Sequence, residues 1–135
     1  MEPRISFVTL GVRDLAQAAA FYEDVLGLPR LKTPPEIVFF EMGKTWLALY
    51  GRSMLAEDAG MKPDATLPGG FPGFALAHNV ASEQAVDELL AHVKANGGRI
   101  IKPGQQADWC GYSGYLADPD GFIWEVAYNP HFPHV

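Results

Sequence analysis

Residues 117–128 read ADPDGFIWEVAY and join a turn to a strongly apolar strand that carries one charge. The DPDG motif at its start has Pro at the second turn position and Gly at the fourth, and β-forming residues follow directly. Side chains alternate between the two faces of a strand, so Glu125 lies between Ile123 and Ala127 on one face. A bare carboxylate buried there would be costly, so Glu125 needs a partner, a metal ion or water. Glu125 is the first candidate site residue, and the structural alternative is a solvated carboxylate on an edge strand.

Composition limits the classes of function. The chain has 135 residues, of which 48% are hydrophobic and 12% aromatic, enough apolar material for the core of one domain. Its formal net charge is −6 and its Lys and Arg residues are not clustered. Nucleic acid and an anionic membrane are therefore not expected as partners.

Two further features bear on location and redox chemistry. No apolar run approaches the about 20 residues of a membrane helix, and the N-terminus lacks the apolar core of a signal peptide, so a cytoplasmic location is expected. Cys110 is the only cysteine, which excludes an internal disulfide and a multi-cysteine zinc site. Cys110 could be a lone nucleophile, but a small residue beside Trp109 in a strand-like run is more often a packing residue.

The first part of the chain, residues 1–51, reads as a strand, a helix and about three strands. Residues 5–12 alternate in the manner of a strand. Asp14 stands at an N-cap position, and apolar residues then recur every three or four positions as far as Leu26. Residues 37–50 read as a hairpin with a two-residue turn at Gly43 and Lys44.

The pattern repeats after a segment of different character. Residues 52–71, with a short helical pattern followed by several Gly and Pro, are predicted to be a linker or lid. Residues 72–129 again read as a strand, a helix that begins after the N-cap Ser82, and three strands, and residues 130–135 form a tail. Residues 43–50 can be laid on residues 121–128 without a gap. Two tandem βαβββ units are therefore predicted.

This arrangement resembles the vicinal oxygen chelate superfamily, which includes glyoxalase I, bleomycin-resistance proteins and extradiol dioxygenases. The motifs that carry the resemblance are VRDL at residues 12–15, FY at 21–22, VLGL at 25–28 and DPDGFIWE at 118–125. The resemblance implies a single α+β domain over residues 1–135. Its two units form a curved mixed sheet with helices on the convex side and a cavity on the concave side. The resemblance also implies a homodimer.

Metal-dependent members of that superfamily place one metal ligand on the first strand of each unit and one on the last. The resemblance carries the closing ligand onto Glu125. The other places fall on Phe7, on Phe74 and on Ala48, or on Leu47 in the gap-free register. One carboxylate among rings cannot hold a divalent ion, because catalytic sites need about three protein ligands. The usual metal site is therefore predicted to be largely lost, and no cofactor is expected.

Alternation predicts an aromatic cavity wall. The residues expected on the cavity side are Phe7, Trp46, Ala48, Tyr50, Phe74, Leu76, His78 and Glu125. His78 could act with Glu125 as acid and base, or it could be a capping or packed histidine at a strand end. Rings and glycines also crowd residues 108–115, where Trp109 and Tyr112 suit either a ligand wall or a glycine-kinked core strand.

These observations lead to one main interpretation and two alternatives. The predicted ligand-binding residues are Phe7, Trp46, Tyr50, Phe74, His78, Trp109, Tyr112 and Glu125, with Glu125 and His78 as the candidates for catalysis. The main interpretation is a glyoxalase-related protein that binds a small planar or apolar organic ligand in an aromatic-lined cavity, with Glu125 holding a polar or cationic group of that ligand. One alternative is a lyase or dioxygenase of the superfamily, either metal-free or with noncanonical metal ligands. The other is an interaction domain that binds no ligand.

Overall fold

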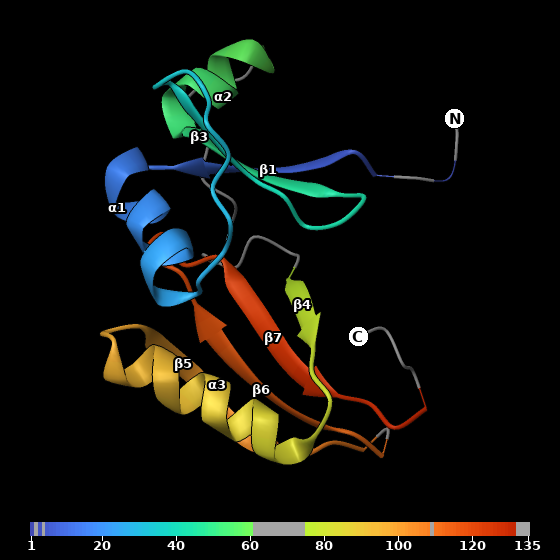
Figure 1. Ribbon diagram of the computed structural model, residues 1–135. Helices are drawn as coiled ribbons and strands as arrows, with labels where there is room; N and C mark the ends of the chain where they lie inside the picture. Colours follow the sequence, from blue (N-terminus) through green and yellow to red (C-terminus); the bar gives the residue numbers. More distant parts are fainter. Residues whose placement is uncertain (2, 4, 61–74, 109, 132–135) are drawn as a thin grey trace. The chain divides into compact units, whose positions relative to one another are not determined.

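The computed structural model describes residues 1, 3, 5–60, 75–108 and 110–131 (Figure 1). The chain divides into two compact units, Met1–Gly70 and Phe71–Val135, each described below by itself. Each unit contains one mixed sheet and at least one helix. The predicted α+β class is confirmed.

The sheet of unit 1 has three strands in the order β1-β3-β2. They are β1 (Phe7–Val12), β2 (Ile37–Phe40) and β3 (Trp46–Gly51). Strand β1 runs parallel to β3, and β2 runs antiparallel to it. The pairing of Phe40 with Leu47 puts Gly43 and Lys44 at the centre of the hairpin loop. Gly43 has φ +72°, a conformation that glycine adopts readily. The turn therefore lies where it was predicted, but the connection between the strands comprises residues 41–45 and is longer than the predicted two residues.

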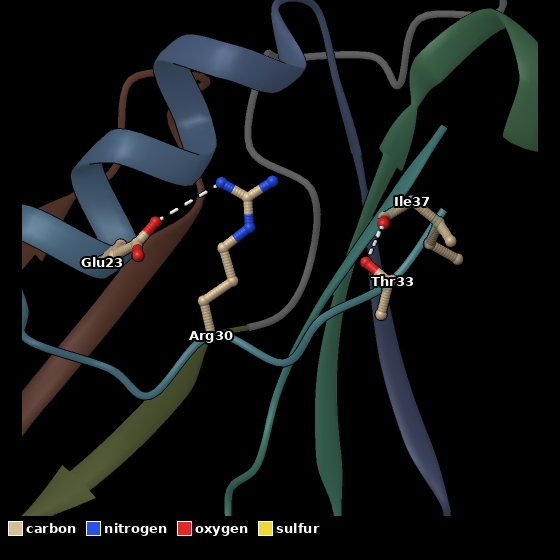
Figure 2. A network of polar contacts seen from close by, with 4 residues as sticks. All are labelled: Glu23, Arg30, Thr33 and Ile37. Atoms are coloured by element: carbon tan, nitrogen blue, oxygen red, sulfur yellow. Dashed lines mark hydrogen bonds and ion pairs between the residues drawn. The ribbon is translucent and has the colours of Figure 1, made fainter. Parts of the chain in front are cut away.

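The third strand expected after the helix of unit 1 is reduced to a single bridge. Arg30 forms an isolated antiparallel bridge with Phe40, and the Leu31 N–H donates to the Phe39 carbonyl oxygen at 2.9 Å. Three prolines in residues 29–35 lack the N–H that a longer ladder needs. Side chains hold the segment instead, as Figure 2 shows: Arg30 pairs with Glu23 at 3.4 Å, and the Thr33 hydroxyl donates to the Ile37 carbonyl.

The helices of unit 1 cover its sheet. Helix α1 (Leu15–Ala20) begins at the predicted N-cap Asp14, whose side chain accepts the Gln17 N–H at 2.9 Å. The expected α-helix continues as the π-helical turn η1 (Phe21–Val25). The Tyr22 ring, which is fully buried, lies 5.9 Å from the Phe40 ring, so the helix covers the sheet face of Phe40 and its partner Leu47. A second helix, α2 (Arg52–Asp58), occupies the start of the predicted linker and packs on β1 and β3.

Unit 2 has a four-stranded sheet in the order β4-β7-β6-β5. Its elements are β4 (Leu76–Asn79), α3 (Glu83–Ala95), β5 (Arg99–Gln106), β6 (Tyr112–Ala117) and β7 (Ile123–Tyr128). Strand β4 is parallel to β7, and the other neighbours are antiparallel. Helix α3 starts at the predicted N-cap Ser82 and lies along β5, β6 and β7 (Figure 1). It has 13 residues, and none of the helices in the described ranges is long and apolar enough to cross a membrane.

The DPDG motif forms the predicted turn between β6 and β7. The Asp118 side chain is buried, and its Oδ1 accepts the N–H groups of Asp120 at 2.9 Å and Phe122 at 2.8 Å. The Gly121 N–H donates to the Asp118 carbonyl oxygen at 3.0 Å, with Gly121 at φ +91°. A carboxylate that accepts two backbone N–H groups closes the turn tightly.

Gly114 of β6 lies directly under α3, so adding a methyl group there should destabilise unit 2. A Cβ at this position would come 2.5 Å from Leu90 Cδ1 and 2.8 Å from the Lys102 carbonyl oxygen. We expect Gly114→Ala to lower the free energy of unfolding by about 1–3 kcal/mol, measured by urea denaturation. Gly51→Ala is the control, since its Cβ would only meet Met54 Sδ at 3.5 Å. Equal losses in the two variants would contradict this packing.

Candidate functional site

The two faces of the unit 2 sheet carry different side chains. Gly114 lies against Leu90 of α3, and the Tyr112 hydroxyl donates to Asp87 of α3 at 3.0 and 3.1 Å, so both residues are on the α3 side. Alternation along β6 therefore puts Tyr115 on the opposite face, which we call the distal face. Glu125 pairs with Tyr115 across β6 and β7 and lies on this face too.

Glu125 has a partner on the distal face. The Tyr115 hydroxyl donates to Glu125 Oε1 at 3.0 Å, and both side chains are half-buried. Lys102 pairs with Tyr115 on β5, and its Nζ lies 5.9 Å from the centroid of the Tyr115 ring. Lys102, Tyr115 and Glu125 thus form a row across three neighbouring strands, which we call the polar row.

The sequence analysis did not single out Tyr115. The position of the turn could have identified it. Once the turn pairs Ala117 with Ile123, the antiparallel register places Tyr115 opposite Glu125. Burial, the hydrogen bond to Glu125 and the negative charge of that carboxylate raise the pKa of Tyr115 above its ordinary value of 10.0. The hydroxyl therefore remains a hydrogen-bond donor at neutral pH.

Tyr112, a predicted ligand-wall residue, lies on the other side of the sheet from Glu125. Its hydroxyl is engaged by Asp87 of α3, and Gly104 provides the room, since a Cβ there would come 2.6 Å from Tyr112 Cε1. The hydrogen bond to Asp87, burial and the charges of Asp87 and Glu83 raise the pKa of Tyr112. Tyr112 therefore ties β6 to α3. Composition alone could not decide between the two faces.

The expectation that His78 shares a face with Glu125 is wrong. In the parallel pair of β4 and β7, Ala77 pairs with Glu125 and His78 pairs with Val126. His78 is exposed and lies on the sheet face opposite to Glu125, so the two do not form an acid–base pair within unit 2. The sequence around β4 does not determine the register, and a shift of one residue moves every side chain to the other face.

Three rings gather on one face of the unit 1 sheet. The centroids of Phe7 and Phe39 are 5.5 Å apart, those of Phe7 and Trp46 are 5.9 Å apart, and those of Phe39 and Trp46 are 6.1 Å apart. Phe7 is 50% exposed, and the other two are half-buried. The face is opposite to the one that η1 covers, as predicted for Phe7 and Trp46. Phe39 was missed, although its alternation with Val38 and Phe40 places it there; we call the three rings the aromatic cluster.

Tyr50 lies on the same face of β3 but contacts α2. Burial, the negative charge of Asp58 and a hydrogen bond to that carboxylate raise the pKa of Tyr50 above 10.0. Gly11, which pairs with Tyr50, lies beneath α2, with a Cβ position 3.2 Å from Leu55 Cδ2. This end of the face is therefore covered by α2. Phe74 and Trp109, the remaining predicted ligand-binding residues, lie outside the described residues.

A pocket in unit 1 does not coincide with any predicted site residue. It has a volume of about 430 Å³ and is lined by Leu15, Ala16, Ala19, Ala20, Glu23, Asp24, Arg30, Pro35 and Val38. It lies beside α1 and η1, on the side of the sheet away from the aromatic cluster. Its Arg30 is already paired with Glu23 (Figure 2). None of the residues of the aromatic cluster or of the polar row lines this pocket.

Comparison with known proteins decides the family. A family profile described as "Glyoxalase/Bleomycin resistance protein/Dioxygenase superfamily" matches residues 4–126. The chain belongs to this superfamily. The glyoxalase-related enzyme from Fulvimarina pelagi has a similar structure, with 38% identity and a TM-score of 0.85, over 97% of this chain and 91% of that one. The prediction of family from the sequence is confirmed.

Two further proteins are similar to this chain over most of its length. The lactoylglutathione lyase from Agrobacterium tumefaciens has 28% identity and a TM-score of 0.71, with 96% of this chain and 98% of that one covered. The uncharacterized protein YraH from Bacillus subtilis (strain 168) is 27% identical over 122 residues, which are 88% of this chain and 93% of that one.

The residues present do not fit the metal centre implied by the superfamily resemblance. Phe7 and Ala48, at two of the ligand positions, have no donor atoms. Beside Glu125, the neighbouring strands offer the neutral hydroxyl of Tyr115 and the methyl group of Ala77. Within the described ranges, no group of three His, Cys, Asp or Glu residues could hold a metal ion.

The raised pKa of Tyr115 gives a prediction for alkaline stability. As the pH rises past about 10, the unfolded chain loses the phenolic proton before the folded chain does. The stabilisation by this group is complete below the unfolded pKa and is lost as the pH rises through the raised folded pKa. We expect Tyr115→Phe to flatten the fall in free energy of unfolding above pH 10, measured by urea denaturation at several pH values.

The matched variant for that experiment is Tyr112→Phe, which removes the hydroxyl bonded to Asp87 on the other face. It should flatten the alkaline fall as well, and the double variant should flatten it further, because the two bonds are separate. If the free energy of unfolding of Tyr115→Phe fell with pH as steeply as that of the unmodified protein, the hydrogen bond to Glu125 would not raise the pKa of the Tyr115 hydroxyl.

Proposed function

We propose that this chain binds a small, planar or apolar organic ligand on the aromatic cluster of unit 1. The observation that carries the proposal is the half-exposed ring of Phe7 beside those of Phe39 and Trp46. Adjacent rings at these separations form a stacking surface, and apolar ligand walls are typically built of such side chains. A ligand that covers the exposed part of Phe7 removes apolar surface from water.

Binding without metal chemistry is consistent with the side chains at the superfamily's ligand positions. Phenylalanine and alanine stand at two of them, and rings there favour stacking over coordination. The name of the superfamily includes proteins that confer bleomycin resistance as well as enzymes. We propose the binding role by analogy with the former.

Ligand binding should be detectable through the fluorescence of Trp46. We expect at least one compound in a panel of quinone-like and bleomycin-like aromatics to quench it at micromolar concentrations. Phe7→Ala and Phe39→Ala should each lower the affinity for that compound about five- to tenfold, because each removes one stacking ring. Affinities are measured by fluorescence titration, with Trp46→Phe identifying the tryptophan that responds.

Ile101→Ala is the control for that titration, since it removes another exposed large apolar side chain, 47% exposed, from unit 2. Its affinities should equal those of the unmodified protein. If no compound of the panel binds, or if the ring variants bind it unchanged, the stacking surface is wrong and a ligand-free interaction domain becomes the better interpretation.

The second candidate function is an enzyme of the lyase or dioxygenase kinds in this superfamily. The bond from the Tyr115 hydroxyl to Glu125 favours it, because a carboxylate oriented by a fixed donor suits proton transfer. The similarity to a structure described as a glyoxalase-related enzyme also supports this candidate. In this candidate Glu125 accepts a proton from the substrate, and the Tyr115 hydroxyl holds the Glu125 carboxylate in place. The other version of this candidate is an enzyme that binds a metal ion through noncanonical ligands.

Metal analysis separates the candidates. After purification from cells grown with added Zn²⁺, Ni²⁺ and Mn²⁺, we expect substoichiometric metal by mass spectrometry, unchanged in Glu125→Ala. The reason is that the described donors at the superfamily's positions are too few to bind a divalent ion. A stoichiometric ion that is lost in Glu125→Ala would overturn the binding-only proposal and favour a metal-dependent enzyme.

We also propose that the protein forms a homodimer, as the superfamily resemblance implies. Multi-angle light scattering at several protein concentrations measures the molar mass directly. A mass equal to that of one chain at all concentrations would exclude the dimer. The cytoplasmic location expected from the sequence stays a prediction.

A further inference from the structure

We infer that the polar row of unit 2, formed by Lys102, Tyr115 and Glu125, is a subsite for the protonated amine of a small organic ligand. This inference concerns side chains of unit 2, whereas the stacking proposal concerns the aromatic cluster of unit 1. The experiments below test it independently of the proposed stacking function.

The carboxylate of the polar row is oriented by a neighbouring strand. The Tyr115 hydroxyl donates to Glu125 Oε1 at 3.0 Å, and the two residues face each other directly in the register of β6 and β7. This bond uses one of the roughly four lone-pair positions of a carboxylate. An incoming ammonium group, which has only donors, can use the others through charge-assisted hydrogen bonds.

On the side of Glu125 away from Tyr115, the neighbouring strand of unit 2 presents a small residue. The residue opposite Glu125 on β4 is Ala77, which is exposed and contributes only a methyl group to the distal face. His78 belongs to the opposite face, so its imidazole does not compete for the carboxylate. Within unit 2, β4 therefore places no bulky or polar side chain beside Glu125 on the distal face.

The ring of Tyr115 already has the ammonium group of a lysine over its face. Lys102 Nζ lies 5.9 Å from its centroid, within the range of about 6 Å for a cation–π contact. The Lys102 side chain is exposed, so it can leave the ring when a ligand ammonium arrives. A carboxylate next to an electron-rich ring recognises protonated amines, and the net charge of −6 also attracts cations.

The charge of the ligand is the variable that tests this subsite. We would compare benzylammonium with benzyl alcohol and benzoate by isothermal titration at low salt. These three probes have the same ring and differ in charge. We expect benzylammonium to bind about tenfold more tightly than benzyl alcohol, and benzoate to bind most weakly.

Three variants assign that preference to the polar row. Glu125→Gln should abolish the preference for benzylammonium over benzyl alcohol, and Tyr115→Phe should reduce it about threefold while leaving benzyl alcohol unaffected. Lys102→Met should strengthen the binding of benzylammonium about threefold, because it removes both a cation that competes for the Tyr115 ring and a charge of the same sign as the ligand. Tyr112→Phe is the matched control: it changes the same atom on the same strand but on the α3 side, so the preference should persist.

The outcomes separate this inference from the stacking proposal. In Phe7→Ala the ratio of the benzylammonium affinity to the benzyl alcohol affinity should not change, because Phe7 is not part of the polar row. Equal binding of the two probes, or a preference that survives Glu125→Gln, would overturn the amine subsite. Weaker benzylammonium binding in Lys102→Met, together with loss of benzoate binding, would also overturn it and indicate an anion site at Lys102.

Discussion

The buried carboxylate of Asp118 holds the turn on which the unit 2 sheet depends. By accepting the N–H groups of Asp120 and Phe122, it determines where β7 starts relative to the end of β6. That register brings Tyr115 opposite Glu125. One local hydrogen-bonded turn thus sets the pair of Tyr115 and Glu125 in the polar row, whereas the pairing of β5 with β6 adds Lys102.

The two units use similar frames for different chemistry. Each has a first strand parallel to its last strand, with a helix between them in the chain. In unit 1 the face away from η1 carries three adjoining rings, whereas the distal face of unit 2 carries a carboxylate, a hydroxyl and an ammonium group. The proposed stacking and the proposed charge recognition therefore rest on different side chains on one architecture. This is consistent with the functional range that the name of the superfamily describes.

Local signals in the sequence were sufficient for much of the fold. The caps at Asp14 and Ser82 and the turns at Gly43 and Gly121 follow from short-range chemistry, and all four are present. The main departure in unit 1 is the missing strand after η1, where prolines limit the ladder to one bridge. The positions of the prolines are given by the sequence. Their effect on pairing depends on which N–H groups of the segment lie opposite carbonyl groups of the neighbouring strand, and only the structure shows this.

The sequence by itself determined the superfamily, the α+β class, and the inward or outward alternation within β1, β3 and β7, because these depend on residues close in the chain. The tertiary structure alone decided which side chains join Glu125. Tyr112 and His78 lie on the opposite face, while Tyr115 and Ala77 flank the carboxylate. The physical reason is that side chains alternate with period two, so a strand's face depends on pairing with a strand distant in sequence, and a shift of one residue reverses it.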